Sequence, residues 1–198
     1  MNPANSLTVA RIILSPIFLV LFLSHSPTLN IVSTFVFIIA ALTDALDGQV
    51  ARKYGYQSDF GVFMDPLADK VLTAAAWIAF VQTDYMPAWM AYAMITRELL
   101  ITGLRSISAA SVGDMIQPSV LGKAKTVVQM VVIIAVLVWS NMSTVALEAR
   151  WPQVSTALIH PIIPWSIEML LWVAVLLTVG TGLEYTYRYA SVVRAAFK

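Results

Sequence analysis

Four aspartates between residues 44 and 69 form the group of side chains best suited to chemistry. Asp44 and Asp47 are three residues apart, and Asp65 and Asp69 are four apart. On helices, either spacing projects both carboxylates from one face. Carboxylate oxygens suit hard cations such as Mg²⁺, Mn²⁺ or Ca²⁺. Four of them can hold two ions that clamp phosphoryl oxygens during an in-line displacement. The spacing therefore predicts a two-metal site for phosphoryl transfer.

Small and basic residues accompany these aspartates. Gly61 lies four residues before Asp65, and Gly48 follows Asp47, so that a ligand or another backbone could approach closely at both positions. Arg52 lies between the two pairs. An alternative is that the aspartates are structural and are neutralised by basic neighbours, with Arg52 acting as a topology anchor. Both interpretations remain open from spacing alone.

The composition indicates a membrane protein. Of 198 residues, 59% are hydrophobic and 12% are charged, whereas a soluble domain has about 25% charged residues. A charge at membrane depth costs about 2.5–3.5 kcal/mol, so the acidic cluster needs a compensating partner. The net charge of +1 argues against a nucleic-acid partner, and the absence of cysteine excludes disulfides and thiolate metal sites. We expect one integral membrane catalytic domain, residues 1–198.

Apolar runs predict an all-α polytopic protein with six transmembrane helices. A loop with a short surface helix is expected between residues 141 and 161. The predicted spans are residues 8–24, 29–52, 62–82, 87–110, 118–140 and 162–186.

The basic residues predict the orientation of these spans. With six spans, every Lys and Arg except Arg150 falls on one side of the membrane. Basic residues are enriched in cytoplasmic loops. Both termini and the aspartate cluster are therefore expected to face the cytoplasm. The first apolar run lacks a convincing cleavage site and is expected to be retained as a helix.

A second group of charged residues follows in the fourth and fifth spans. Arg97 and Arg105 are eight residues apart, on nearly the same helix face, and Lys123 and Lys125 begin the fifth span. Guanidinium and ammonium groups are suited to binding a phosphate. Taken singly, each of these residues could equally be a topology anchor. Together they predict a site for the phosphate of a second, anionic substrate, with Glu98 expected to pair with a nearby Arg.

The aspartates belong to a longer pattern that resembles the signature of the CDP-alcohol phosphatidyltransferase family. The pattern has eight fixed positions within residues 44–69, and this sequence matches all of them. Further stretches resemble the bacterial phosphatidylglycerophosphate synthase branch of that family. The eight signature positions are Asp44, Asp47, Gly48, Ala51, Arg52, Gly61, Asp65 and Asp69; the further stretches are residues 2–8, 95–98, 103–105, 122–126 and 182–185.

This resemblance implies the CDP-alcohol phosphotransferase fold, a homodimer, and a site at the cytosolic face of a bacterial cytoplasmic membrane. It implies two divalent ions, Mg²⁺ or Mn²⁺, on the four aspartates, with Asp69 as general base. The implied reaction joins CDP-diacylglycerol to sn-glycerol 3-phosphate, giving phosphatidylglycerophosphate and CMP. The residues implied to bind the CDP-lipid are Asn5, Thr8, Gly48, Arg52, Ser58 and Gly61.

Other functions remain open at this stage. Relatives with the same aspartates use inositol phosphate, serine, choline or phosphatidylglycerol as acceptor. A protein of another class, a cation-coupled transporter, could also carry intramembrane aspartates. It should show internal repeats and interrupted helices, and the sequence shows no repeat. A non-catalytic scaffold is disfavoured because no signature position is lost.

Overall fold

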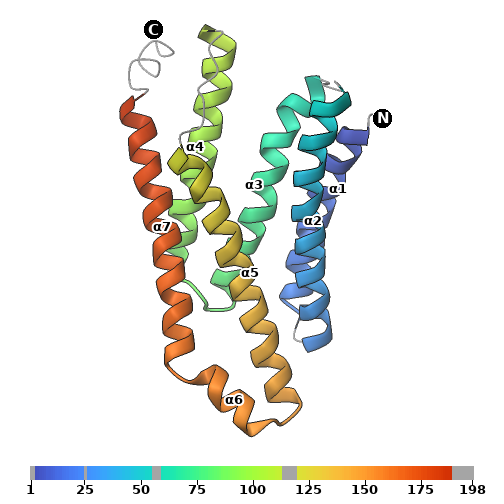
Figure 1. Ribbon diagram of the computed structural model, residues 1–198, viewed down its shortest axis with the longest axis vertical. Helices are drawn as coiled ribbons and strands as arrows, with labels where there is room; N and C mark the ends of the chain where they lie inside the picture. The colour runs from blue at the N-terminus through green and yellow to red at the C-terminus, as the bar shows by residue number, and fades with distance from the viewer. Residues whose placement is uncertain (1–2, 25, 55–58, 113–119, 189–198) are drawn as a thin grey trace. The chain divides into compact units, whose positions relative to one another are not determined.

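The computed structural model describes residues 3–24, 26–54, 59–112 and 120–188. This part of the chain is helical and contains no strand (Figure 1). Six long helices and one short helix follow one another: α1 (Pro3–Phe22), α2 (Pro27–Tyr54), α3 (Asp59–Gln82), α4 (Ala88–Val112), α5 (Val120–Glu148), α6 (Pro152–Ile159) and α7 (Ile162–Arg188).

The long helices correspond to the six predicted spans, and the all-α prediction is confirmed. The boundaries differ most at α5, which continues to Glu148 instead of ending near residue 140. The expected short helix is α6. Among the described residues, two helical stretches are long and apolar enough to cross a membrane, Ala124–Glu148 and Gln153–Tyr187. Three shorter apolar stretches lie in α1, α2 and α3. The number of membrane crossings therefore stays a prediction.

The helices form two compact units. Residues 1–85 and 137–160 make up unit 1, and residues 86–136 and 161–198 make up unit 2. In unit 1, α1 packs against both α2 and α3, which also contact each other (Figure 1). In unit 2, α4 packs against α7. The boundary between the units falls within α5, so this helix contributes residues to both.

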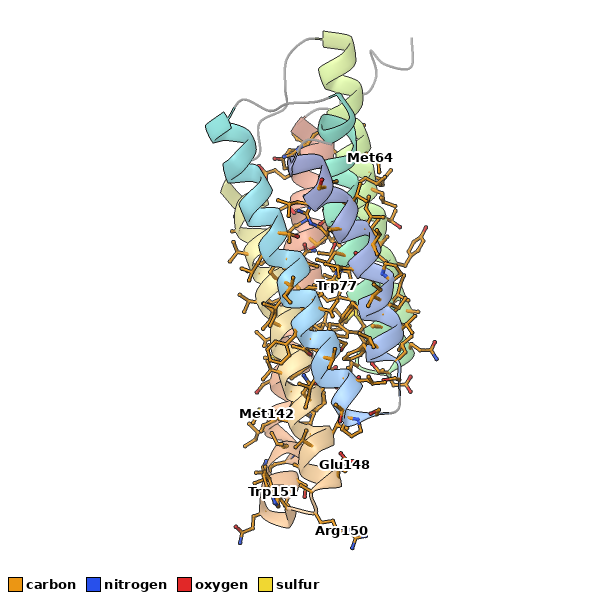
Figure 2. The ribbon with its side chains drawn as sticks, turned by 90° about the vertical axis from the view of Figure 1, so that its right-hand side faces the viewer. Met64, Trp77, Met142, Glu148, Arg150 and Trp151 are labelled. Carbon is orange, nitrogen blue, oxygen red and sulfur yellow. The ribbon has the colours of Figure 1, made fainter. Side chains whose placement is uncertain are left out.

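Aromatic rings from three helices form the core of unit 1. Phe18 of α1 lies 5.3 Å from Phe37 of α2, centroid to centroid. Phe22 lies 6.0 Å from Phe80 of α3, edge to face. Trp77, labelled in Figure 2, contacts Phe80 at 5.8 Å and is almost fully buried. Such rings add about 0.5–1.5 kcal/mol per pair beyond their buried area, so these contacts hold α1, α2 and α3 together.

The end of α3 is fixed by a Schellman motif. Asp84 has φ 59°, in the left-handed region, and the Tyr85 backbone N–H donates to the Phe80 carbonyl at 2.9 Å. This pattern satisfies carbonyls that the helix would otherwise leave without donors. It also places the Tyr85 ring 5.2 Å from Trp139 of α5, and its hydroxyl 2.9 Å from the Ser140 hydroxyl. The turn thereby links α3 to the last part of α5.

The end of α5 is fixed by a second Schellman motif. Arg150 has φ 51°, and the Trp151 backbone N–H donates to the Ala146 carbonyl at 3.1 Å. Figure 2 shows Arg150 and Trp151 at this end of the helix. The Trp139 indole donates to the Leu158 carbonyl of α6 at 3.3 Å. A tight turn and one side-chain hydrogen bond therefore position the short helix.

Many large apolar side chains are exposed on the outside of the helices, and several polar side chains are buried beside the apolar core. Thr8, Arg11 and Ser15 of α1 are fully buried. Helices with so apolar an exterior are suited to lipid as the surrounding solvent, so the chain is a membrane protein. Large apolar side chains that are more than half exposed include Phe35, Leu42, Leu100, Val127, Leu147, Leu176 and Leu183.

The aromatic core gives a test of the packing. Phe80→Ala should lower the free energy of unfolding in detergent by about 3–5 kcal/mol, because it removes a fully buried ring that contacts the rings of Phe22, Trp77 and Tyr85. Ile78→Ala, two residues away at a 49% exposed position, should cost less than about 1 kcal/mol. Thermal or denaturant unfolding of the two purified variants measures the difference. Equal losses would contradict the assignment of Phe80 to the core.

Candidate active site

The signature residues lie on two consecutive helices that contact each other. Asp44 and Asp47 fall in the C-terminal half of α2, and Asp65 and Asp69 fall in the N-terminal half of α3. Residues 55–58 separate the two helices, so these halves adjoin the same connection. The backbone is helical at all four positions, as the spacing argument requires.

The side chains of the four aspartates lie outside the described residues, as do those of Gly48, Arg52 and Gly61. Ser58 lies in a part of the chain that is not described at all. Among the side chains that are described, no group of three His, Cys, Asp or Glu residues could hold a metal ion. The donor set itself fits the expected ions, because four carboxylates on two contacting helices offer the oxygen ligands that Mg²⁺ and Mn²⁺ prefer.

Helix α1 supplies a polar stripe against these two helices. Thr8 is fully buried, and Arg11 and Ser15 continue the same face at spacings of three and four residues. The Ser15 hydroxyl donates to the Arg11 carbonyl at 2.8 Å. Asn5 lies one turn earlier in α1, with a side chain outside the described set. Because α1 packs on both α2 and α3, this buried stripe lies in the same unit as the helices that carry the signature.

Unit 2 contains a buried ion pair between α4 and α5. The Lys125 ammonium donates to Glu98 Oε1, and the same oxygen lies 3.7 Å from Arg97 Nη1. Lys125 is 2% exposed and Glu98 is 7% exposed. The expected pairing of Glu98 with a nearby Arg is confirmed. The sequence did not predict that Lys125 would share this carboxylate, and the Lys123 side chain lies outside the described residues.

Helix α7 holds the two arginines of α4. Arg97 Nη2 donates to the Thr181 hydroxyl at 2.9 Å, and Arg105 Nη2 donates to the Tyr185 hydroxyl at 2.9 Å. The Arg105 guanidinium carbon also lies 5.3 Å from the centre of the Tyr185 ring, and that of Arg97 lies 6.0 Å from it. These distances allow cation–π attraction. The α4–α7 contact therefore fixes where both guanidinium groups lie.

Gly182 makes this arrangement possible. A Cβ atom added there would lie 2.8 Å from Arg97 Cγ, which is closer than carbon atoms approach in van der Waals contact. Cγ lies near the base of the arginine side chain and cannot move aside without displacing the guanidinium. A side chain at position 182 is therefore incompatible with the observed place of Arg97.

Among the described side chains where α4, α5 and α7 meet, the charges do not balance. Arg97, Arg105 and Lys125 carry three positive charges, while Glu98 carries one negative charge. Counting Glu184, the neighbour of Tyr185 in sequence, still leaves an excess of positive charge. In partly buried surroundings such an excess favours binding of an anion, and guanidinium groups match the geometry of phosphate oxygens.

Thr181 and Tyr185 were not among the candidate site residues from the sequence. A signal was present: together with Thr178 they form a polar face at helical spacing in an otherwise apolar span. Thr178 accepts a hydrogen bond from Gln129 of α5 at 3.0 Å. The partners of Thr181 and Tyr185 lie 84 and 80 residues away in sequence, so the pattern alone could not identify them.

Comparison with known proteins identifies the family of this chain. The model of the CDP-alcohol phosphatidyltransferase family matches residues 1–180. Three curated relatives carry the name CDP-diacylglycerol–glycerol-3-phosphate 3-phosphatidyltransferase. The Bacillus subtilis (strain 168) protein is 37% identical, covering 93% of both chains. The Rickettsia bellii (strain RML369-C) protein is 31% identical, again covering 93% of both.

The third relative, from Salmonella paratyphi A (strain ATCC 9150 / SARB42), is 39% identical over 70% of this chain and 77% of its own. The family match covers the signature helices, α4 and most of α7, and ends just before Thr181. The chain belongs to the CDP-alcohol phosphatidyltransferase family.

Proposed function

We propose that this enzyme transfers the phosphatidyl group of CDP-diacylglycerol to sn-glycerol 3-phosphate, giving phosphatidylglycerophosphate and CMP. The names of the relatives support both substrates. The observation that carries the acceptor assignment is the cluster of Arg97, Arg105 and Lys125, whose excess positive charge suits a phosphate-bearing alcohol. A neutral acceptor such as serine would leave that charge uncompensated.

In the proposed reaction, the 1-hydroxyl of glycerol 3-phosphate attacks the phosphorus that bears the lipid. Asp69 accepts the proton of this hydroxyl as the new P–O bond forms. The bond from that phosphorus to the bridging oxygen breaks, and CMP leaves with the electron pair. Arg97, Arg105, Lys123 and Lys125 hold the acceptor phosphate and so orient the hydroxyl.

The pyrophosphate side of the site is assigned to unit 1. Two divalent ions, Mg²⁺ or Mn²⁺, on Asp44, Asp47, Asp65 and Asp69 would neutralise the charge of the pyrophosphate and of the departing CMP. The small residues of the signature give the nucleotide room to approach the helices. The residues proposed to bind the CDP-lipid are Asn5, Thr8, Gly48, Arg52, Ser58 and Gly61.

The proposed setting is the bacterial cytoplasmic membrane. The bacterial relatives and the apolar exterior of the helices support this, and the one-sided distribution of basic residues supports cytoplasmic termini and a cytoplasmic site. Six transmembrane helices, one catalytic domain over residues 1–198 and a homodimer complete the proposal. In this setting a lipid substrate and a water-soluble acceptor can meet at the membrane surface.

The acceptor is tested with the purified enzyme in detergent and lipid mixed micelles. With Mg²⁺ or Mn²⁺ present, CMP should be released from CDP-diacylglycerol when glycerol 3-phosphate is added, and chelation of the metal with EDTA should stop the release. Serine, inositol phosphate and phosphatidylglycerol serve as matched acceptors. Faster release with one of these would overturn the acceptor assignment. Metal-dependent ion flux in liposomes without CMP release would favour the transporter.

The general base is tested with Asp69→Asn. Turnover should fall by about 10²–10⁴-fold, because the amide cannot accept the proton of the attacking hydroxyl, while CDP-diacylglycerol binding is partly retained. Asp84→Asn is the matched control: Asp84 is exposed and has φ 59°, which asparagine also tolerates. It should leave turnover unchanged. Single-turnover CMP release and equilibrium binding separate the two effects, and near-normal turnover by Asp69→Asn would rule out its role as base.

The acceptor site is tested with Arg105→Gln. The KM for glycerol 3-phosphate should rise about 10- to 100-fold, because a charge-assisted hydrogen bond to the phosphate is lost. The KM for CDP-diacylglycerol should stay near its normal value. Arg150→Gln, which changes an exposed arginine at the α5–α6 turn, should alter neither constant. A parallel rise of both KM values in Arg105→Gln would contradict the assignment.

A further inference from the structure

Tyr185 of α7 contacts both arginines of α4. Its side chain is buried, at 5% exposure. Its hydroxyl accepts a hydrogen bond from Arg105 Nη2 at 2.9 Å, and its ring lies 5.3 Å from the Arg105 guanidinium carbon. The Arg97 guanidinium carbon lies 6.0 Å from the same ring. The Tyr185 side chain thus contacts the guanidinium groups of two arginines that lie about two turns apart on α4.

Two guanidinium groups beside one ring repel each other, and the repulsion is strong where the dielectric constant is low. Long, flexible arginine side chains would relieve it by turning apart. The hydrogen bonds to Thr181 and Tyr185 and the attraction to the ring oppose that movement. The side chains of α7 therefore keep the two charges together, an arrangement that an anion bound between them would stabilise.

The arginines also retain donors for such an anion. A guanidinium has five N–H groups. The Nε atoms of Arg97 and Arg105 are buried and, among the residues that the structure describes, have no hydrogen-bond acceptor. The terminal Nη groups carry the other four N–H donors of each guanidinium. A phosphate has several oxygens that can accept from such donors.

We propose that Tyr185 is a positioning residue for the acceptor site. It holds the Arg105 guanidinium by a hydrogen bond and its ring face, and so presents this group to the phosphate of the acceptor alcohol. Tyr185 acts through Arg105 and does not itself touch the substrate. This inference rests on the proposed function, because it assumes that Arg105 binds the phosphate of glycerol 3-phosphate.

Two neighbours of Tyr185 perform the same task for Arg97. Thr181, one turn earlier in α7, accepts a hydrogen bond from Arg97 Nη2, and Gly182 leaves space for the base of the Arg97 side chain. The opposite end of the α4–α7 pair is held by Trp89 and Trp172, whose rings lie 5.5 Å apart. The register of the two helices is thus fixed on both sides of the pair, which keeps the polar residues opposite each other.

The experiment measures KM values for both substrates with the full-length enzyme in mixed micelles. Tyr185→Phe removes only the hydroxyl and should raise the KM for glycerol 3-phosphate about 3- to 10-fold, with kcat and the KM for CDP-diacylglycerol near normal. Tyr185→Leu also removes the ring and should give a larger rise. Tyr187→Phe, the same change two residues later at an 89% exposed position, should have no effect.

A double-mutant cycle tests whether Tyr185 acts through Arg105. In the Arg105→Gln background, Tyr185→Phe should cause no further rise in the KM for glycerol 3-phosphate, because the residue that it positions is gone. The same 3- to 10-fold rise in both backgrounds would overturn the proposal. So would a normal KM in Tyr185→Phe, or equal changes in the KM values of both substrates, since a general loss of structure affects both.

A second variant covers the case in which changes at Tyr185 impair folding. Thr181→Val is nearly isosteric and removes the hydroxyl that receives Arg97 Nη2. It should also raise the KM for glycerol 3-phosphate selectively, and a normal KM here would count against the positioning role of α7. Failure of the proposed function is distinguishable, because it would appear first in the unmodified enzyme as no CMP release with glycerol 3-phosphate.

Discussion

Polar groups in a lipid-facing helical protein need partners inside the protein, and this constraint determines much of what the structure shows. Lipid offers no hydrogen bonds, so an unsatisfied donor or acceptor costs several kcal/mol. Gln129 of α5 accordingly pairs with Thr178 of α7 at 3.0 Å. In unit 1, Asn141 of α5 donates to Thr34 of α2 at 2.8 Å. Each hydrogen bond fixes how far one helix is shifted along the other. Contacts between apolar side chains are less directional and specify this register less strictly.

The same constraint makes a concentration of buried charge informative. Lys125 and Glu98 compensate each other, and a pair of this kind can be purely structural. Arg105 differs, because its hydrogen-bond partner on α7 is the neutral hydroxyl of Tyr185. Arg97 likewise donates to a neutral hydroxyl, that of Thr181, and shares the single carboxylate of Glu98 with Lys125. Neutral partners satisfy donors but leave the charge in place. A chain that keeps two such guanidinium groups together in an apolar protein has a use for the charge, and an anionic substrate provides one.

The sequence predicted the elements of this fold better than their interactions. Long apolar runs identified all six long helices, because the length and composition of a lipid-facing helix leave few alternatives. The pairing of Glu98 with an arginine was also predictable, since Arg97 is its neighbour. The contact of Lys125 with the same carboxylate was not predictable, because it depends on how α4 packs against α5. The end of α5 was placed too early for a similar reason: the helix ends at a Schellman motif in which Arg150 occupies the position usually taken by glycine.

The α4–α7 contact shows why arginine at position 105 and tyrosine at position 185 suit phosphate binding better than lysine and phenylalanine would. Lysine at position 105 would keep the charge, but its ammonium cannot both lie flat against a ring and offer a planar set of donors to a phosphate. Phenylalanine at position 185 would keep the ring and lose the acceptor that orients the guanidinium. Glycine at position 182 is demanded by the 2.8 Å approach of the Arg97 side chain. The arginine, the tyrosine and the glycine are therefore all required by the same packing of α4 against α7. This packing holds positive charge in place, together with N–H donors that have no acceptor in the described part of the chain. Specificity for a phosphate-bearing acceptor can thus be built into helix packing, at residues that never touch the acceptor.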